Sequence, residues 1–234
     1  VLMSISNVVL KFVFASNLGK IPRVQYSKLR RVAAARRVFA EHGLKNATVR
    51  DICDLAEANV AAVSYHFGGK EELSVAVLQA YMQDMQNLYP RDEGVTTLSR
   101  PEDRLRAYIR SFLLQTLGDG DPVNDGLGRL LTREFIEPSR HFSELFDRQC
   151  RPTHEYLLGI VRQCLPGADE TTVARAASSI IGQCVLFDFA GEAIVRMNPE
   201  LVLKAGNIEA LSDFITEFSL GGLERLRTAQ RQAA

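Results

Sequence analysis

The segment Thr48–Leu73, TVRDICDLAEANVAAVSYHFGGKEEL, carries the clearest structural signals in this chain of 234 residues. Thr48 is followed three residues later by Asp51, and this pair predicts a capping box at the start of a helix, with Asp in place of the usual Glu or Gln. Asn59 is a favourable N-cap for a very short helix over residues 60–66, which two glycines end. Two short helices joined by a tight turn are typical of a helix-turn-helix.

A longer helix is predicted ahead of this segment, over residues 27–42, and Gly43 would end it as a C′ glycine. Its apolar residues at three- and four-residue spacing form a stripe that we expect to be buried: Leu29, Val32, Ala33, Ala35 and Phe39. We expect its arginines to face outward: Arg30, Arg31 and Arg37. The buried face of the next helix would consist of Ile52, Leu55 and Ala56.

The helix over residues 60–66 is too short to be stable alone, so one face must pack against its domain. Helical periodicity predicts an inward stripe of Val60, Val63 and Phe67. The outer face would then carry two small residues and one aromatic: Ala61, Ala62 and Tyr65. Small residues let a backbone approach base edges, and Tyr65 and His66 can reach phosphate or base. Lys70 begins a further helix, whose N-terminus favours an anion.

Charge is distributed unevenly along a chain that is neutral overall, with 28 basic and 28 acidic residues. Residues 20–50 contain nine lysines and arginines but one acidic residue, Glu41. This local excess predicts that the N-terminal part meets a polyanion. Four scattered cysteines without a C-x-x-C pair favour a reducing compartment over a disulfide scaffold. We find no run of about 18 uncharged apolar residues, so we expect no membrane partner.

The rest of the sequence also has helical periodicity, and strand-like alternation is confined to residues 8–15. We therefore expect an all-α fold of about nine helices. A fourth helix would run from Lys70 to about Leu88, and residues 118–126 would form a loop. Prolines, which helix interiors tolerate poorly, bound several of the remaining helices. These are predicted over residues 101–117, 126–136, 139–164, 169–197 and 207–229.

The segment over residues 48–73 resembles the DNA-binding domain of the tetracycline-repressor (TetR) family. It matches the family motif at Thr48, Ile52, Phe67, Lys70 and Leu73, and His66 stands where the family has Tyr or His. It departs from the motif at the turn glycine, at a Gly-Thr pair and at a tyrosine, which are replaced here by Glu57, Ala61-Ala62 and Ser64. The variant NVAAVSYHFGGKEEL and the segment REFIEPS over residues 133–139 are similar to the branch with a CerR-type C-terminal domain.

The apolar N-terminal stretch predicts an extension over residues 1–24. The resemblance implies a DNA-binding domain over residues 25–85, with the helix-turn-helix at about 47–67. Residues 86–234 would bind a ligand and form a homodimer. The dimer would place two short helices in the major groove of a near-palindromic, double-stranded DNA operator. The residues expected near bases are Arg50, Asn59, Val60, Ala61 and Ala62. The residues expected mostly at phosphates are Thr48, Ser64, Tyr65, His66 and Lys70.

The resemblance further implies a cytoplasmic regulator, nucleoid-associated when bound to DNA, that acts as a repressor and is released by a small-molecule inducer. Pockets commonly combine aromatic walls with a few polar groups, and the pocket residues we single out are Phe112, Gln115, Arg133, Phe135, His154 and Phe187. An inward Arg133 would favour an anionic or carbonyl-bearing ligand. The apolar helices over residues 169–197 and 207–229 fit a dimer built as a four-helix bundle, although a monomer core could carry the same stripe.

The sequence shows no complete metal or catalytic site. Cys150 and His154 have the i, i+4 spacing of metal ligands but no third ligand, and the acidic loop 119–125 lacks the glycine and glutamate of a calcium loop. Asp188 and Glu192 lie one helical turn apart without a nucleophile or a phosphate-binding loop. We therefore expect no metal, no cofactor and no enzymatic activity. The alternative function is a small-molecule binding module whose DNA-binding head is degenerate at Glu57 and Ala61-Ala62.

Overall fold

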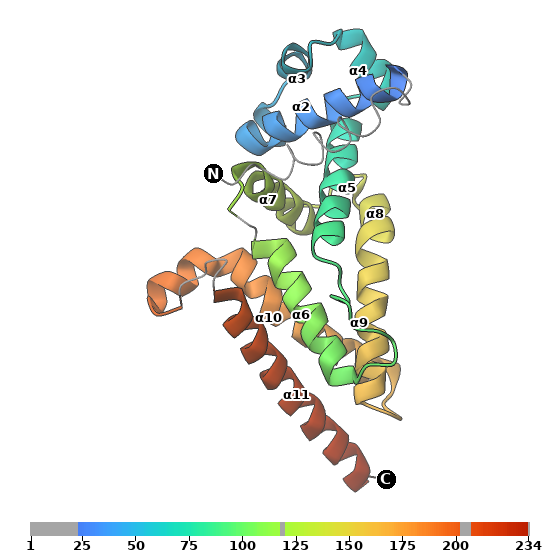
Figure 1. Ribbon diagram of the computed structural model, residues 1–234, viewed down its shortest axis with the longest axis vertical. Helices are drawn as coiled ribbons and strands as arrows, with labels where there is room; N and C mark the ends of the chain where they lie inside the picture. The colour runs from blue at the N-terminus through green and yellow to red at the C-terminus, as the bar shows by residue number, and fades with distance from the viewer. Residues whose placement is uncertain (1–22, 118–119, 202–206, 234) are drawn as a thin grey trace. The chain divides into compact units, whose positions relative to one another are not determined.

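The computed structural model describes residues 23–117, 120–201 and 207–233, with side chains left out at 23–28, 62–64 and 233 (Figure 1). Every regular element in these ranges is helical, which confirms the all-α prediction. The chain divides into two compact units. The first unit comprises Val1–Leu78 and Asp121–Arg133, and the second comprises Gln79–Gly120 and Glu134–Ala234.

The first unit is built around three helices, α2 (Arg23–Asn46), α3 (Val49–Ala56) and α4 (Val60–Phe67), followed by the start of α5 (Lys70–Leu88). Helix α2 packs against α3, and α3 packs against α4. Gly43 interrupts α2 with φ 68° and ψ 169°, a left-handed conformation that glycine adopts without a Cβ clash. The predicted break at this glycine is therefore confirmed, and one further helical turn follows it.

The buried face of α2 differs from the predicted stripe. Leu29, expected inside, is 48% exposed, whereas Arg31, expected outside, is 2% exposed. The residues actually buried follow the i, i+3, i+4, i+7, i+8 pattern: Arg31, Ala34, Ala35, Val38 and Phe39. Both the predicted and the observed apolar stripe contain alanines of this helix. Packing against neighbouring helices, rather than the local sequence pattern, therefore decides which face of α2 is buried. The long aliphatic stem of an arginine can occupy such an inner position.

A similar shift occurs on α3. Leu55 is 46% exposed, although the sequence predicted it on the inner face, and Cys53 is 1% exposed in its place. Ile52 and Ala56 are buried as predicted. Cysteine behaves as a small hydrophobe, which makes it a good fit for a tight helix–helix contact.

Helix α7 (Pro122–Ile136) completes the first unit, and it begins four residues earlier than the predicted helix. The carboxylate of Asp121 accepts hydrogen bonds from the backbone N–H groups of Val123 (2.9 Å) and Asn124 (3.2 Å). Asp121 is therefore an N-cap and Pro122 takes the first helical position, so the predicted loop over 118–126 is too long. A Cβ on Gly126 would lie 2.5 Å from the carbonyl oxygen of Ala40, so α7 approaches α2 where only glycine fits.

The second unit has a hydrophobic core shared by α6 (Pro101–Leu117), α9 (Arg151–Cys164), α10 (Glu170–Met197) and α11 (Ile208–Ala233). Helix α6 packs against the other three. Each helix contributes fully buried aliphatic side chains, among them Leu105, Ile109, Leu113, Leu157, Ile160, Val161, Ala177, Ile180 and Ile215. Asp169 caps α10 by accepting a hydrogen bond from the N–H of Thr172 at 3.0 Å.

One predicted helix, over residues 139–164, is divided in the structure. It consists of α8 (Phe142–Leu145), a π-helical turn over Phe146–Cys150, and α9. Pro152 stands at the start of α9, and a proline ring clashes with the carbonyl four residues before it in a regular helix. The wider π-helical turn directly ahead of Pro152 relieves this clash.

Helix α10 is both long and apolar. By length and composition alone it could cross a membrane, with a mean hydropathy of 1.4 over an 18-residue window of which 17% is buried. The sequence reading did not flag this segment, because charged residues interrupt it. The helix packs against α6, α9 and α11 of its own unit and bends at Ala190 (φ −119°, ψ 16°). One such helix is weak evidence of a membrane span.

Candidate nucleic-acid interface

The predicted capping box at the start of α3 is present. The Oγ1 of Thr48 accepts a hydrogen bond from the N–H of Asp51 at 3.1 Å, and Oδ2 of Asp51 accepts one from the N–H of Thr48 at 3.0 Å. The Thr48 hydroxyl also donates to Oδ2 of Asp51 at 2.7 Å. These hydrogen bonds from the side chain and backbone of Thr48 hold the pKa of Asp51 below its usual value. Arg50, the second residue of α3, is exposed.

The turn between α3 and α4 keeps a tight geometry without a glycine. Glu57 adopts the left-handed conformation, with φ 49° and ψ 48°, and its N–H donates to the carbonyl of Asp54 at 3.3 Å. The N–H of Ala58 donates to the carbonyl of Cys53 at 2.9 Å. The carboxylate of Glu57 accepts a hydrogen bond from Nη2 of Arg30 on α2 at 2.9 Å. The turn is therefore closed by backbone hydrogen bonds and tied to α2 by an ion pair.

Helix α4 begins at the predicted cap. The Oδ1 of Asn59 accepts a hydrogen bond from the N–H of Ala61 at 2.9 Å, so Asn59 acts as the N-cap. Val60, predicted to point inward, is 47% exposed, because it lies at the first residue of the helix. Ala61 is exposed and Phe67 is half-buried, while the side chains of residues 62–64 lie outside the description. The predictions for Ala62, Val63 and Ser64 therefore stay predictions.

The end of α4 carries a prominent aromatic pair. Tyr65 is 86% exposed, which places it on the outer face, and His66 is half-buried. The two rings meet edge to face, with centroids 5.0 Å apart and planes at 81°. This arrangement leaves the Tyr65 hydroxyl in solvent, where it can donate to a phosphate or a base.

Lys70, at the start of α5, is engaged within the protein. Its Nζ donates to the backbone carbonyls of Leu44 (2.8 Å), Ala47 (3.0 Å) and Lys45 (3.4 Å). An ammonium group has three donors, so these carbonyls can use all of them. Lys70 thus fastens the end of α2 to the start of α5. The phosphate contact stays a prediction, and the geometry gives this residue a structural role that the sequence did not indicate.

The six predicted pocket residues lie in different environments. Phe112 and Phe187 pack against the hydrophobic core, His154 is half-buried on α9, and Gln115 donates to the carbonyl of Tyr89 at 2.7 Å. Arg133 is exposed and falls in the first unit. Phe135 is 47% exposed, with its ring against Phe142 at 5.3 Å.

Two polar groups of the second unit escaped the sequence reading. Tyr108 is buried in the core, with its ring stacked on Tyr156 at a centroid distance of 6.3 Å, and Arg104 is buried beside them. The i, i+4 spacing of Arg104 and Tyr108 on α6 was the available signal, but an arginine that follows two acidic residues is normally interpreted as a solvated position.

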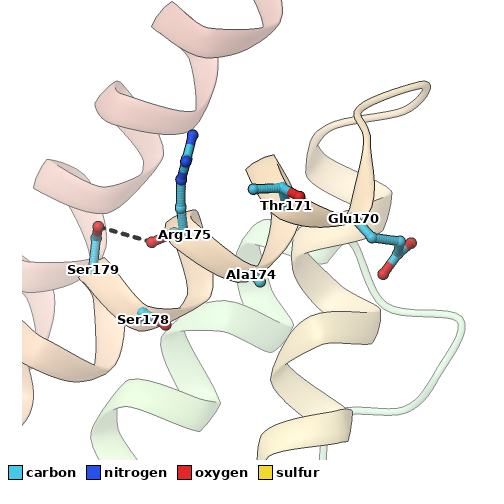
Figure 2. Close-up of a pocket in the computed structure, with 6 residues that line it drawn as sticks. All are labelled: Glu170, Thr171, Ala174, Arg175, Ser178 and Ser179. Carbon is cyan, nitrogen blue, oxygen red and sulfur yellow. Dashed lines mark hydrogen bonds between the residues drawn. The ribbon is translucent and has the colours of Figure 1, made fainter.

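A hollow lies along the exposed face of α10, near its first residue (Figure 2). It is lined by one helix alone: Glu170, Thr171, Ala174, Arg175, Ser178 and Ser179. The hydroxyl of Ser179 donates to the carbonyl of Arg175 at 2.9 Å, and Glu170 is held by Arg162. This hollow is a shallow surface feature and contains none of the predicted pocket residues. Among the described residues, no group of three or more His, Cys, Asp or Glu could hold a metal ion.

Two sequence families match this chain. Residues 32–77 match the family described as "Bacterial regulatory proteins, tetR family", and residues 101–223 match "HTH-type transcriptional dual regulator CecR, C-terminal domain". The chain is 28% identical to the HTH-type transcriptional dual regulator CecR of Shigella flexneri over 181 residues, which cover 73% of this chain and 79% of that protein. The branch expected as CerR-type is thereby identified as the CecR branch.

Solved structures of regulators share the fold. A TetR-like transcriptional regulator from Rhodococcus sp. RHA1 matches with a TM-score of 0.61 and 15% identity, over 88% of this chain and 99% of that one. The regulator FadR from Bacillus subtilis, in complex with stearoyl-CoA, matches with a TM-score of 0.62 and 19% identity, over 83% and 98%. Because the CecR match alone covers more than half of the sequence, the chain belongs to the TetR family of bacterial transcriptional regulators and carries a CecR-type C-terminal domain.

Proposed function

We propose that this chain forms a homodimer that binds a near-palindromic operator, represses transcription there and is released by a small-molecule inducer. The observation that carries this proposal is the closed turn at Glu57, because it holds α3 and α4 as a helix-turn-helix despite the missing glycine. We take residues 25–85 as the DNA-binding domain, 86–234 as the ligand-binding and dimerisation domain, and 1–24 as an extension.

In this proposal α4 enters the major groove. Its exposed start and the exposed Arg50 would approach bases, so the base-contacting set is Arg50, Asn59, Val60, Ala61 and Ala62. The phosphate-contacting set is Thr48, Ser64, Tyr65, His66 and Lys70. The basic excess over residues 20–50 would add attraction for any DNA and steer association.

The dimer would form through α10 and α11. These helices carry large apolar side chains that the single chain leaves in solvent: Leu186, Phe189, Phe214 and Phe218. The rings of Phe214 and Phe218 stack at 6.2 Å and form a continuous apolar surface. Two helices from each subunit would bury this surface in a four-helix bundle, whose two-fold symmetry matches a palindromic operator.

Release would follow from a shift in population. An inducer that binds the second unit more tightly in a state with mismatched recognition helices lowers the fraction of chains competent for DNA. FadR, which shares this fold, is bound to stearoyl-CoA, and we propose that the second unit of this chain likewise holds a small molecule. We propose that the protein acts in the cytoplasm, on the nucleoid when bound to DNA.

The alternative of a binding module with a degenerate head rested on Glu57 and Ala61-Ala62. The left-handed conformation of Glu57 removes the main reason for it, since the turn geometry is retained. Small residues at 61 and 62 are compatible with close approach of α4 to DNA. The matched families are transcriptional regulators, and such proteins are generally not enzymes.

Selection of bound fragments from a random DNA pool tests the proposal. Salt of about 150 mM suppresses purely electrostatic binding and leaves sequence-specific binding. We expect enrichment of one near-palindromic motif by the full-length protein. Weak binding that is abolished by salt, with no enriched motif, would favour the binding module instead.

A further inference from the structure

We propose that Arg104 is the anion-recognising residue of the effector site, so that the effector carries a carboxylate or phosphate group. Arg104 lies in the first turn of α6 and is 4% exposed. A buried guanidinium loses its hydration, and this loss is normally offset by a carboxylate partner. The inference rests on the proposed function, because it names the chemical class of the effector in that account.

The contacts of Arg104 fix the position of its guanidinium group but do not neutralise its positive charge. Its Nη1 donates to Oε1 of Gln163 on α9 at 3.0 Å, and its Cζ lies 5.3 Å from the centroid of the Tyr156 ring. The Nε is buried and has no hydrogen-bond partner. Among the described residues, no carboxylate lies within ion-pair distance of Arg104. A neutral amide and an aromatic face therefore orient this cation, and its counter-charge is left to a ligand.

Neighbouring arginines of the same helix show the contrast. Arg106 pairs with Asp213 and Glu217 on α11, although it is more exposed than Arg104. Arg110 also pairs with two carboxylates, those of Glu93 and Glu209. Two half-buried arginines of α6 thus have acidic partners, whereas the buried arginine, which needs one most, has none among the described residues.

A second guanidinium lies beside the same aromatic ring. The Cζ of Arg91 is 5.1 Å from the centroid of Tyr156, and its Nη1 donates to the carbonyl of Pro152 at 2.9 Å. Both guanidinium groups add positive charge around the Tyr156 ring, which favours an anion in this region. Guanidinium groups are suited to this task, since their planar donors match a carboxylate or phosphate in two hydrogen bonds.

The surroundings of this pair specify the rest of the ligand. Tyr108 stacks on Tyr156 at 6.3 Å and 27°, and Phe112 packs on Tyr108 at 6.3 Å. An acid with a flat aromatic body would place its anionic group at the guanidiniums and its ring against this aromatic column. Arg133, which the sequence singled out for an anionic ligand if it pointed inward, is exposed in the first unit, whereas Arg104 is buried in the second.

The test uses three probes that share a ring system: naphthoate, naphthyl phosphate and the neutral naphthamide. Calorimetric titration of the full-length protein should show that at least one anion binds about tenfold or more tightly than the amide, since about 1.4 kcal/mol corresponds to tenfold. Comparing the two anions identifies carboxylate or phosphate as the preferred group. Equal binding of all three probes, or no binding by either anion at about 10 mM, roughly the limit of very weak affinity, would overturn the proposal.

Matched variants separate charge recognition from packing. Arg104→Gln should remove the preference for the anion, Arg104→Lys should keep part of it, and the control Arg106→Gln should leave it unchanged. Urea unfolding without ligand gives a second readout that does not depend on the choice of probe. Replacing an uncompensated buried charge should not destabilise the fold, so Arg104→Met should unfold at the wild-type midpoint or above. A clearly lower midpoint would assign Arg104 to structure and overturn the proposal.

Failure of this inference is distinguishable from failure of the proposed function. If the wild type selects an operator but neither anion binds, only the assignment of Arg104 is rejected. If the anions bind and no operator is selected, the site stands and the regulator account fails.

Discussion

The guanidinium of Arg30 on α2 meets the carboxylate of Glu57 at 2.9 Å, across 27 residues of sequence. Glu57 is also the residue that adopts the left-handed conformation between α3 and α4. One residue therefore closes the turn through its backbone and links it to the preceding helix through its side chain. The family motif has glycine at this position. Glu57 takes its place, with a strained left-handed backbone and an ion pair to Arg30.

Glu57→Gly should leave the fold as stable as the wild type or up to about 1 kcal/mol more stable. It removes a left-handed strain of about 1–2 kcal/mol but loses an exposed ion pair worth about 0–1 kcal/mol and adds chain entropy. Glu57→Ala keeps the strain and loses the pair, so it should be the less stable of the two. Urea denaturation measures both, and a strongly destabilised Glu57→Gly would show that the turn requires the carboxylate.

The capping box gives α3 a defined dependence on acid. Because hydrogen bonds from Thr48 lower the pKa of Asp51 in the folded state, its carboxylate stabilises the fold above the unfolded pKa of 3.8, and this stabilisation is lost as the pH falls through the folded pKa. Asp51→Asn should therefore be less stable than the wild type near pH 7, with a difference that disappears in strong acid. Unfolding free energies measured across that range check it. A difference that is constant with pH would exclude the charged hydrogen bond as its source.

Lys70→Ala should lower the free energy of unfolding by about 1–3 kcal/mol, because it leaves the carbonyls of Leu44 and Ala47 without their charged donor. Lys45→Ala is the matched control, since Lys45 is an exposed lysine of the same region and should change stability little.

The salt dependence of DNA binding tests whether Lys70 also contacts a phosphate. A phosphate contact by Lys70 predicts a slope reduced by about one in Lys70→Ala, and an unchanged slope would leave only the structural role.

Sequence reasoning was most reliable where one residue decides a local backbone feature. The Thr48–Asp51 cap, the Asn59 cap and the break at Gly43 are all present as predicted. The sequence predicted the wrong burial for Leu29 and Arg31 on α2, where two faces of one helix are similarly apolar and packing against neighbouring helices decides which is buried. Nothing local distinguishes those faces, because the choice depends on which side α3 packs.

Arg50→Ala should weaken binding to the selected operator by about tenfold and broaden the preference at one base position, as loss of a good base contact costs about 1–3 kcal/mol. Its position, exposed and directly beside the capped start of α3, is the reason for this expectation. Repeating the selection with the variant measures the effect. A uniform loss of affinity with an unchanged motif would instead assign Arg50 to the DNA backbone.

Phe214→Asp should dissociate the dimer, because a charge would be placed in the apolar surface formed with Phe218. Leu98→Asp is the control, since Leu98 is 95% exposed and lies outside α10 and α11. Sedimentation velocity should report monomers for the first variant and dimers for the second. Dimers in both variants would place the interface elsewhere.

The candidate sites were predictable to different degrees. The caps that position α3 and α4 in the proposed interface could be predicted from the segment around Thr48 and Asn59, because their signals are adjacent in sequence. The buried cluster of Arg104, Tyr108 and Tyr156 was missed, because it joins α6 to α9 over some fifty residues of chain and an arginine reads as a surface residue. Only the packing of these helices shows that this charge is inside.

The most direct test of the whole account is the composition of the complex on a single selected DNA fragment. Analytical ultracentrifugation gives its mass, and the motif gives its symmetry. We predict two chains on one fragment, with inverted half-sites centred about 34 Å or a multiple of one helical turn apart. A single chain on an asymmetric site would contradict a symmetric dimer that presents two copies of α4 to the major groove.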